Sequence, residues 1–143
     1  MFIGEYTHNL DSKGRLAVPV RFREALKGGA VVTRGIDKCL TLYSLIEWRK
    51  IADRLANLPT GSADARAFTR LMLAGAMAVD LDRAGRIVIP QYLRKFANLS
   101  GSVVVAGLYS RVELWHQKDW QAYQEKAEGE TGDLAAKLTE LGV

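Results

Sequence analysis

Hydrophobic and polar residues alternate at the start of the chain. The alternation runs from Tyr6 to Leu10 and returns at Leu16 and Val18, after the turn-forming letters DSKG. A two-residue period places every second side chain on one face of a strand, so each stretch predicts a strand with one buried face. Because only a short turn-forming segment separates them, the pattern predicts a β-hairpin over residues 5–18.

A short helix and two further strands are predicted next. Pro19 suits the first turn of a helix, since its φ is fixed and it has no N–H to leave unpaired. Phe22 and Leu26 follow with the four-residue spacing of one helix face. The apolar letters VVTRG (31–35) and LTLYS (40–44) then predict two short strands.

A longer helix is predicted after the second of these strands. Ser44 and Glu47 have the spacing of a capping box, in which each residue bonds a free backbone N–H of the other. The apolar stripe behind it consists of Trp48, Ile51, Leu55 and Leu58. A turn and a connecting helix are expected up to Gly75, and after Tyr123 we expect a polar tail that includes a packed helix.

The chain contains two copies of one unit. LDSKGRLAVP at 10–19 aligns with LDRAGRIVIP at 81–90 at an offset of 71, with five of ten residues identical, against roughly one expected by chance. Units this small bury too little surface alone, so we expect one pseudo-twofold core in a mainly β, α+β fold. The expected segments are repeat 1 at 5–47, a helix and connecting helix at 48–75, repeat 2 at 76–119, and a helical acidic tail at 120–143.

Composition adds a basic body to this picture. The chain has 143 residues, of which 48% are hydrophobic and 25% charged, as in ordinary globular domains. Residues 121–143 hold two basic and five acidic side chains, a net charge of −3, so the overall +4 corresponds to +7 for residues 1–120. A basic surface permits a polyanionic partner. Because Cys39 is the single cysteine, an intrachain disulfide is excluded. The sequence contains neither a secretion signal nor a membrane-spanning apolar run. We therefore expect a cytoplasmic protein.

The paired loops DSKGR and DRAGR contain the residues that indicate a function. Asp11 and Asp82 can accept hydrogen bonds from backbone N–H groups two residues on, and Gly14 and Gly85 can adopt positive φ. These four residues are therefore predicted to shape the loops.

The loops' arginines are not explained by turn geometry. Arg15 and Arg86 fall on the face opposite the apolar residues, and a guanidinium suits phosphate oxygens or the guanine edge. Lys13 and Arg83 add charge beside them. Two basic hairpins are thus predicted to contact nucleic acid, and the competing interpretation is a solvated arginine paired with a neighbouring aspartate.

Enzymatic and metal-binding alternatives fit the sequence less well. Asp11 and Asp82 could form a proton-sharing dyad of a hydrolase, but an adjacent arginine holds a carboxylate ionised. His8 and His116 lack the spacing of metal ligands, and Cys39 lies in an apolar run typical of the core. We therefore expect no catalytic activity, no metal and no cofactor.

The ordered motifs resemble those of the MraZ family along essentially the whole chain. They are MFIGEY at 1–6, DSKGRLAVPVRFRE at 11–24, DARAFTR at 64–70, the second DxxGR at 82–86 and ELW at 113–115. The resemblance implies two SpoVT/AbrB-type DNA-binding modules that intertwine as a swapped-hairpin barrel with peripheral helices, and a homo-oligomer that forms a ring.

The same resemblance implies a nucleoid-associated transcriptional regulator, most simply a repressor, of the bacterial division and cell-wall gene cluster that includes its own promoter. Its partner would be double-stranded DNA with short G-rich direct repeats, with no membrane or small-molecule substrate. Lys13, Arg15 and Arg86 match the family's basic loop positions, whereas Ala84 replaces the second lysine. Further candidate contacts on the helices are Arg21, Arg23 and Arg94. The alternative is an antitoxin-like protein-interaction module.

Overall fold

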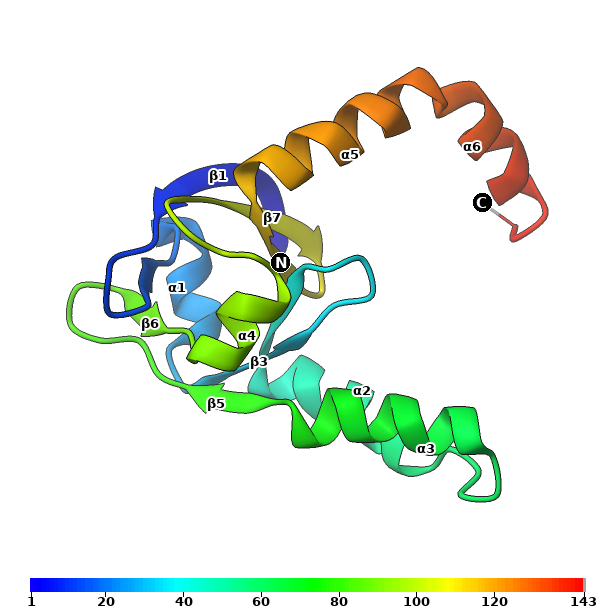
Figure 1. Cartoon of the computed structure of the whole chain (residues 1–143), viewed down its shortest axis with the longest axis horizontal. Coiled ribbons are helices and arrows are strands. Elements are labelled where there is room, and N and C mark those ends of the chain that lie inside the picture. Colours follow the sequence, from blue (N-terminus) through cyan, green and yellow to red (C-terminus); the bar gives the residue numbers. More distant parts are fainter. Residues whose placement is uncertain (143) are drawn as a thin grey trace.

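The computed structural model describes residues 1–142 and shows a mixed, mainly sheet α+β fold in which helices flank the strands (Figure 1). The strands are β1 (Phe2–Asn9), β2 (Arg15–Ala17), β3 (Ala30–Arg34), β4 (Leu40–Ser44), β5 (Met77–Val79), β6 (Arg86–Val88), β7 (Ser102–Tyr109) and β8 (Val112–His116). The helices are α1 (Val20–Leu26), α2 (Leu45–Ala56), α3 (Ala63–Thr69), the π-helical turn η1 (Arg70–Ala74), α4 (Gln91–Phe96), α5 (Gln117–Gly129) and α6 (Thr131–Thr139).

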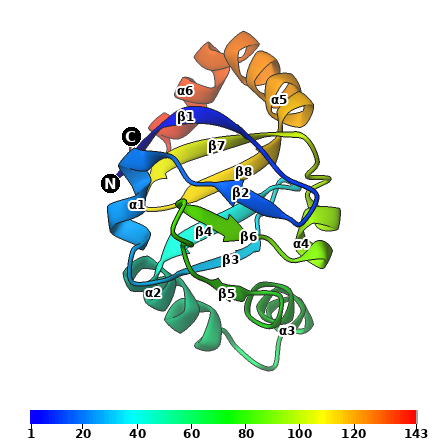
Figure 2. The same cartoon turned by 90° about the vertical axis from the view of Figure 1, so that its left-hand side faces the viewer.

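The two repeats exchange strands. The six-stranded sheet has the order β1-β7-β8-β4-β3-β5, so the first strand of each repeat pairs with the third strand of the other. Exchanging the repeats reverses this order, as a pseudo-twofold axis requires. β2 and β6 form a separate antiparallel ribbon, seen in front of the large sheet in Figure 2. Because the strands form two separate sheets, the expected swapped-hairpin barrel is not confirmed.

The predicted hairpin over residues 5–18 is wrong in its pairing. β1 pairs with β7 from Phe2 to Asn9, and a single bridge, Leu10 to Leu16, joins it to the start of β2. The alternation correctly marks strands, but it does not specify a partner. β7 offers β1 eight paired positions, whereas β2 is only three residues long and pairs with β6.

The core contains matching residues from both repeats. Leu16 and Val18 are 1% and 2% exposed, which confirms the buried face predicted from the two-residue period. Core positions related at the offset of 71 include Leu16 with Ile87, Val18 with Ile89, Phe22 with Leu93, and Leu26 with Ala97. Phe22 also packs edge-on against Phe2 and Tyr6 of β1. Each repeat therefore completes the core of the other.

Local helix signals are confirmed, but burial is shallower than the stripes predict. Ser44 Oγ accepts a hydrogen bond from the Glu47 N–H at 3.3 Å and caps α2. Only Leu55 of the predicted stripe is buried, because a hollow separates part of α2 from the interior strands β4 and β8 of the sheet. The tail forms α5 and α6, and Leu134 and Leu138 of α6 are 39% and 43% exposed, so the expected packing of this helix is wrong. Within residues 1–142, no helix is both long and apolar enough to span a membrane.

Candidate nucleic-acid interface

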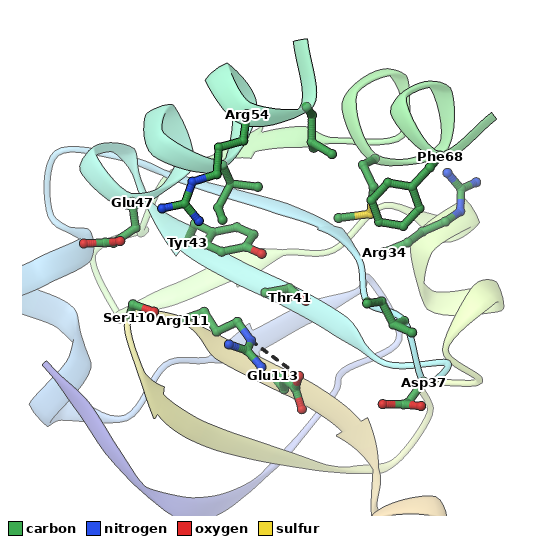
Figure 3. Close-up of a pocket in the computed structure, with 15 residues that line it drawn as sticks. Arg34, Asp37, Thr41, Tyr43, Glu47, Arg54, Phe68, Ser110, Arg111 and Glu113 are labelled. Atoms are coloured by element: carbon green, nitrogen blue, oxygen red, sulfur yellow. Dashed lines mark ion pairs between the residues drawn. The ribbon is translucent and has the colours of Figure 1, made fainter. Parts of the chain in front are cut away.

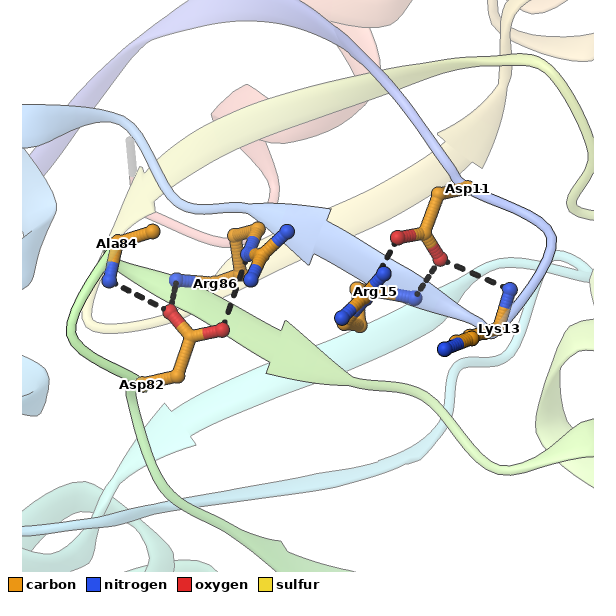
Figure 4. Close-up of polar contacts among 6 residues, drawn as sticks. All are labelled: Asp11, Lys13, Arg15, Asp82, Ala84 and Arg86. Carbon is orange, nitrogen blue, oxygen red and sulfur yellow. Dashed lines mark hydrogen bonds and ion pairs between the residues drawn. The ribbon is translucent and has the colours of Figure 1, made fainter.

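The β2–β6 ribbon presents two arginines on one face. In its register Arg15 lies opposite Val88, and Arg86 lies opposite Ala17. The intervening pair, Leu16 and Ile87, points into the core, so Arg15 and Arg86 share the outer face, as the sequence period predicts. Their side chains are 33% and 37% exposed. Figure 4 shows both on the ribbon, one near each end.

An aspartate holds each arginine in place. Asp11 Oδ1 accepts hydrogen bonds from the backbone N–H groups of Lys13 and Arg15, both at 2.9 Å, and its Oδ2 accepts one from Arg15 Nε at 2.6 Å. Asp82 accepts the equivalent bonds from the N–H groups of Ala84 and Arg86 and from Arg86 Nε, all at 2.9 Å. The carboxylate therefore shapes the turn and fixes the direction of the guanidinium (Figure 4).

The pairing leaves the outer edge of each guanidinium open. In both loops the aspartate binds Nε, and within residues 1–142 the Nη nitrogens of Arg15 and Arg86 have no hydrogen-bond acceptor. The arginine paired with a neighbouring aspartate, which the sequence offered as the competing interpretation, is therefore present. The pairing also orients the guanidinium towards an external acceptor. Because a guanidinium has five N–H donors and the aspartate binds the one on Nε, the Nη donors can bind another group.

The two loops carry the same formal charge. Lys13 is exposed in the first loop, and Arg83 is exposed in the second, where the first loop has Ser12. With one aspartate and two cations each, both loops have a net charge of +1. The second loop has Ala84 where the first has a lysine, but Arg83, one position earlier, supplies the missing positive charge.

The loop aspartates are ionised far below neutral pH. The backbone N–H of Arg15, which outweighs the opposing effect of desolvation, and the Arg15 guanidinium lower the pKa of Asp11 from 3.8 to about 2. The pKa of Asp82 is lowered, chiefly by the backbone N–H of Arg86. Because the folded-state pKa lies below the unfolded one, the stabilisation from ionised Asp11 is complete above pH 4 and disappears as the pH falls towards 2.

A carboxyl titration tests this electrostatic arrangement. We expect the side-chain carbonyl ¹³C resonance of Asp11 to titrate with a midpoint near 2, and that of Asp82 with a midpoint below the ordinary aspartate value. A normal midpoint for Asp11 would show that the clamp on Arg15 is not formed.

Two further arginines, which the sequence suggested only as possible DNA contacts, hold the loops across the repeats. Arg23 of α1 donates from Nε to the Val18 carbonyl at 2.8 Å and lies against Gly85 of the second loop. Arg94 of α4 donates from Nε to the Ile89 carbonyl at 2.9 Å and lies against Gly14 of the first loop. Arg23 and Arg94 occupy equivalent positions in the two repeats, 71 residues apart, and this correspondence is the sequence feature that could have indicated a shared structural role.

Backbone hydrogen bonds reinforce this exchange. The Val18 N–H donates to the Gly85 carbonyl at 2.9 Å, and the Ile89 N–H donates to the Gly14 carbonyl at 2.8 Å. Gly14 and Gly85 have φ of +80° and +75° and are buried under the opposite repeat's arginine. Each glycine therefore meets two requirements, positive φ and space for a guanidinium. By contrast, Arg21 is exposed on the surface of α1.

Substitution of Gly85 tests the space requirement. Gly85→Ala is expected to destabilise the protein by about 2 kcal/mol, of which about half reflects positive φ and half the displacement of the Arg23 guanidinium from its bond to Val18. Gly101→Ala is the matched control, since Gly101 has φ of +62° but no neighbour within 4 Å of an added Cβ. Equal losses in denaturant unfolding would show that Arg23 contributes nothing at this position.

The other titratable candidates have structural positions. Cys39 is 1% exposed, and burial raises the pKa of its thiol to about 12, so it stays protonated near neutral pH. His116 Nδ1 accepts a hydrogen bond from the Lys118 N–H at 3.2 Å at the start of α5. Asp11 and Asp82 each bind their own loop rather than one another. In the part of the chain that the structure describes, no cluster of three or more acidic, histidine or cysteine side chains is arranged to hold a metal.

Comparison with known proteins agrees with the repeated architecture. The family model of the MraZ protein, described as antitoxin-like, matches residues 1–71 and again residues 72–140. Relatives named transcriptional regulator MraZ include one from Thermomicrobium roseum, 45% identical over 141 residues and 99% of both chains, and one from Halothermothrix orenii, 45% identical over 143 residues and 100% of both chains. The chain therefore belongs to the MraZ family and contains two copies of the family's repeat.

Proposed function

We propose that this transcriptional regulator binds double-stranded DNA in a sequence-specific manner through the β2–β6 ribbon. The observation that carries the proposal is the pair of aspartate-oriented guanidiniums on one outward face, Arg15 and Arg86, with open Nη groups. A two-stranded ribbon fits the DNA major groove, and an arginine fork matches the O6 and N7 acceptors of guanine. These properties support a direct contact with G-rich sites.

The loop residues divide the work of binding. Arg15 and Arg86 approach bases, because they lie on the ribbon itself and their direction is fixed by Asp11 and Asp82. The exposed side chains of Lys13 and Arg83 lie on the loops beside the ribbon and approach phosphates. Phosphate contacts then position the ribbon, and base contacts give specificity.

The protein acts as a ring-shaped homo-oligomer. The arm formed by α5 and α6 extends away from the sheets in Figure 1, and its apolar residues Tyr123, Leu134 and Leu138 are 50%, 39% and 43% exposed. Such a face favours contact with a second copy, and head-to-tail contacts close into rings. Neighbouring subunits would present their ribbons in the same sense, which fits direct rather than inverted repeats and adds weak contacts through effective concentration.

The regulated genes are the division and cell-wall cluster that contains the protein's own gene, and binding represses their transcription. The protein acts in the bacterial cytoplasm, where it is associated with the nucleoid. Support for this assignment comes from membership of the MraZ family and from the name transcriptional regulator carried by the full-length relatives. A bound ring of ribbons across a promoter would compete with the transcription machinery for the same DNA.

Fluorescence anisotropy on the DNA upstream of the gene tests the proposal. The protein should bind this duplex more tightly than a shuffled duplex of equal composition. If each ribbon makes two to four phosphate contacts, Kd should rise by about 10-fold to 150-fold between roughly 50 and 200 mM salt. Equal binding to both duplexes, or an affinity independent of salt, would contradict sequence-specific binding by a basic ribbon.

A further inference from the structure

A cleft lies between the helices that connect the two repeats and the large sheet. It has a volume of about 430 Å³ and is enclosed by α2, α3 and η1 on one side and by β4 and the β7–β8 turn on the other (Figure 3). Its lining includes no residue of β2, β6 or the loops before them. The volume is within the range of small-molecule sites, about 300–1,000 Å³.

The walls of the cleft combine an apolar side with a polar floor. Ile51, Leu55, Phe68 and Met72 line it from the helices, and Phe68 is 40% exposed. The floor is β4, from which the largely buried side chains of Thr41 and Tyr43 face the cleft (Figure 3). A mainly apolar cleft with a few polar groups is the usual composition of an organic ligand site.

The acidic side chains around the cleft are largely neutralised. Glu47 accepts a hydrogen bond from Lys50 Nζ at 2.9 Å. Glu113 pairs with Arg111 at 3.6 Å and accepts a bond from Trp115 Nε1 at 3.0 Å. The remaining carboxylate, on Asp37, lies across the cleft from Arg54 in Figure 3.

Two cations of the cleft, Arg34 and Arg54, have no carboxylate partner within residues 1–142, and their guanidiniums point in different directions (Figure 3). The guanidinium of Arg34 turns outward, donating to the Leu71 carbonyl at 3.1 Å and lying over the Tyr92 and Phe96 rings. Arg54 extends from α2 towards Tyr43 (Figure 3), and within residues 1–142 no carboxylate lies within ion-pair distance of it. An anion in the cleft would therefore meet Arg54 with little opposing charge.

We propose that this cleft binds a small organic acid with an apolar or aromatic body. The carboxylate of the ligand pairs with Arg54, and the Thr41 and Tyr43 hydroxyls hydrogen-bond to its polar atoms. The ligand's body packs against Leu55, Phe68 and the neighbouring apolar wall. A guanidinium and a carboxylate form a charge-assisted pair, while the apolar wall excludes water from the rest of the molecule. This site is separate from the ribbon and does not depend on DNA binding.

Fluorine NMR with a matched pair of probes tests the site on the full-length protein without DNA. The probes are 4-fluorobenzoate, an anion, and 4-fluorobenzamide, its neutral analogue of nearly equal shape. We expect the ¹⁹F signal of 4-fluorobenzoate to broaden on addition of protein with a Kd on the order of 1 mM, typical of a fragment of this size. The neutral probe should bind at least about fivefold more weakly.

Two variants of α2 locate the binding. Arg54→Gln should weaken 4-fluorobenzoate binding by about fivefold or more, because it removes the charged partner. Arg49→Gln removes the same charge from an exposed position of α2 outside the cleft and should change Kd by less than about twofold. Circular dichroism should confirm that both variants are folded.

Three results would overturn the proposal. These are no broadening up to about 10 mM probe, equal binding of the charged and neutral probes, and equal binding by wild type and Arg54→Gln. A cleft filled by a second copy of the chain would give the first of these results. None of these outcomes bears on DNA binding, so the two proposals fail independently.

Discussion

Replacing both Arg15 and Arg86 with alanine is expected to weaken binding to the upstream DNA by at least about 30-fold. Each arginine that contacts a guanine edge through two donors contributes about 1–3 kcal/mol, and the double variant removes both. The fold should be retained, because both side chains lie on the outer face of the ribbon and neither packs in the core. Anisotropy titration at fixed salt gives the two affinities, and thermal unfolding confirms the fold.

A charge-matched control separates this effect from general electrostatics. Arg49→Ala/Lys118→Ala also removes two positive charges, from exposed positions on α2 and α5. Because these positions are outside the ribbon, we expect a loss of less than about threefold. Wild-type affinity in the ribbon variant, or an equal loss in both variants, would be incompatible with binding through Arg15 and Arg86.

Phe22→Ala is expected to destabilise the protein by about 3–5 kcal/mol, the range for a buried aromatic side chain replaced by alanine. Phe22 is 2% exposed and its ring packs edge-on against Phe2 at 5.2 Å and Tyr6 at 5.4 Å between centroids. It joins α1 to β1, and β1 in turn pairs with β7 of the other repeat. This loss is a large fraction of the total free energy of unfolding of a typical domain, about 5–15 kcal/mol.

Denaturant unfolding measures this loss, and the same helix supplies the control. Val20 begins α1 but is 73% exposed, so Val20→Ala should change the free energy of unfolding by less than about 0.5 kcal/mol. A loss below about 1 kcal/mol for Phe22→Ala would mean that the contact between α1 and the exchanged strand contributes little to stability.

Local periodicity predicts which way a side chain points, but not which strand it meets. The alternation around Leu16 correctly places Arg15 on the outer face, because that direction depends only on the strand's own geometry. The partner of β1 depends on segments about 100 residues away in the chain. The competition between a three-residue β2 and an eight-residue β7 is decided by the number of paired positions, which no local pattern expresses.

In the candidate site, too, local features could be predicted from the sequence, whereas contacts between the repeats could not. Turn chemistry correctly associates Asp11 and Gly14 with the loop, since aspartate binding of nearby N–H groups is local. The role of Arg94 against Gly14 depends on the other repeat, so a loop sequence alone does not predict it. Helical spacing likewise identifies which face of α2 is directed towards the sheet, but not how closely that face packs against it. The cleft lies in the space that remains beside Leu55.

A double-mutant cycle between protein and DNA tests most directly whether the ribbon arginines contact guanine. Wild type and Arg15→Ala/Arg86→Ala are titrated with the upstream duplex and with the same duplex carrying 7-deazaguanine in its repeats, which removes the N7 acceptor. We predict that the modified DNA weakens wild-type binding by about 10-fold or more and weakens the variant by less than about twofold. An unchanged wild-type affinity, or the same loss for both proteins, would contradict guanine recognition by Arg15 and Arg86.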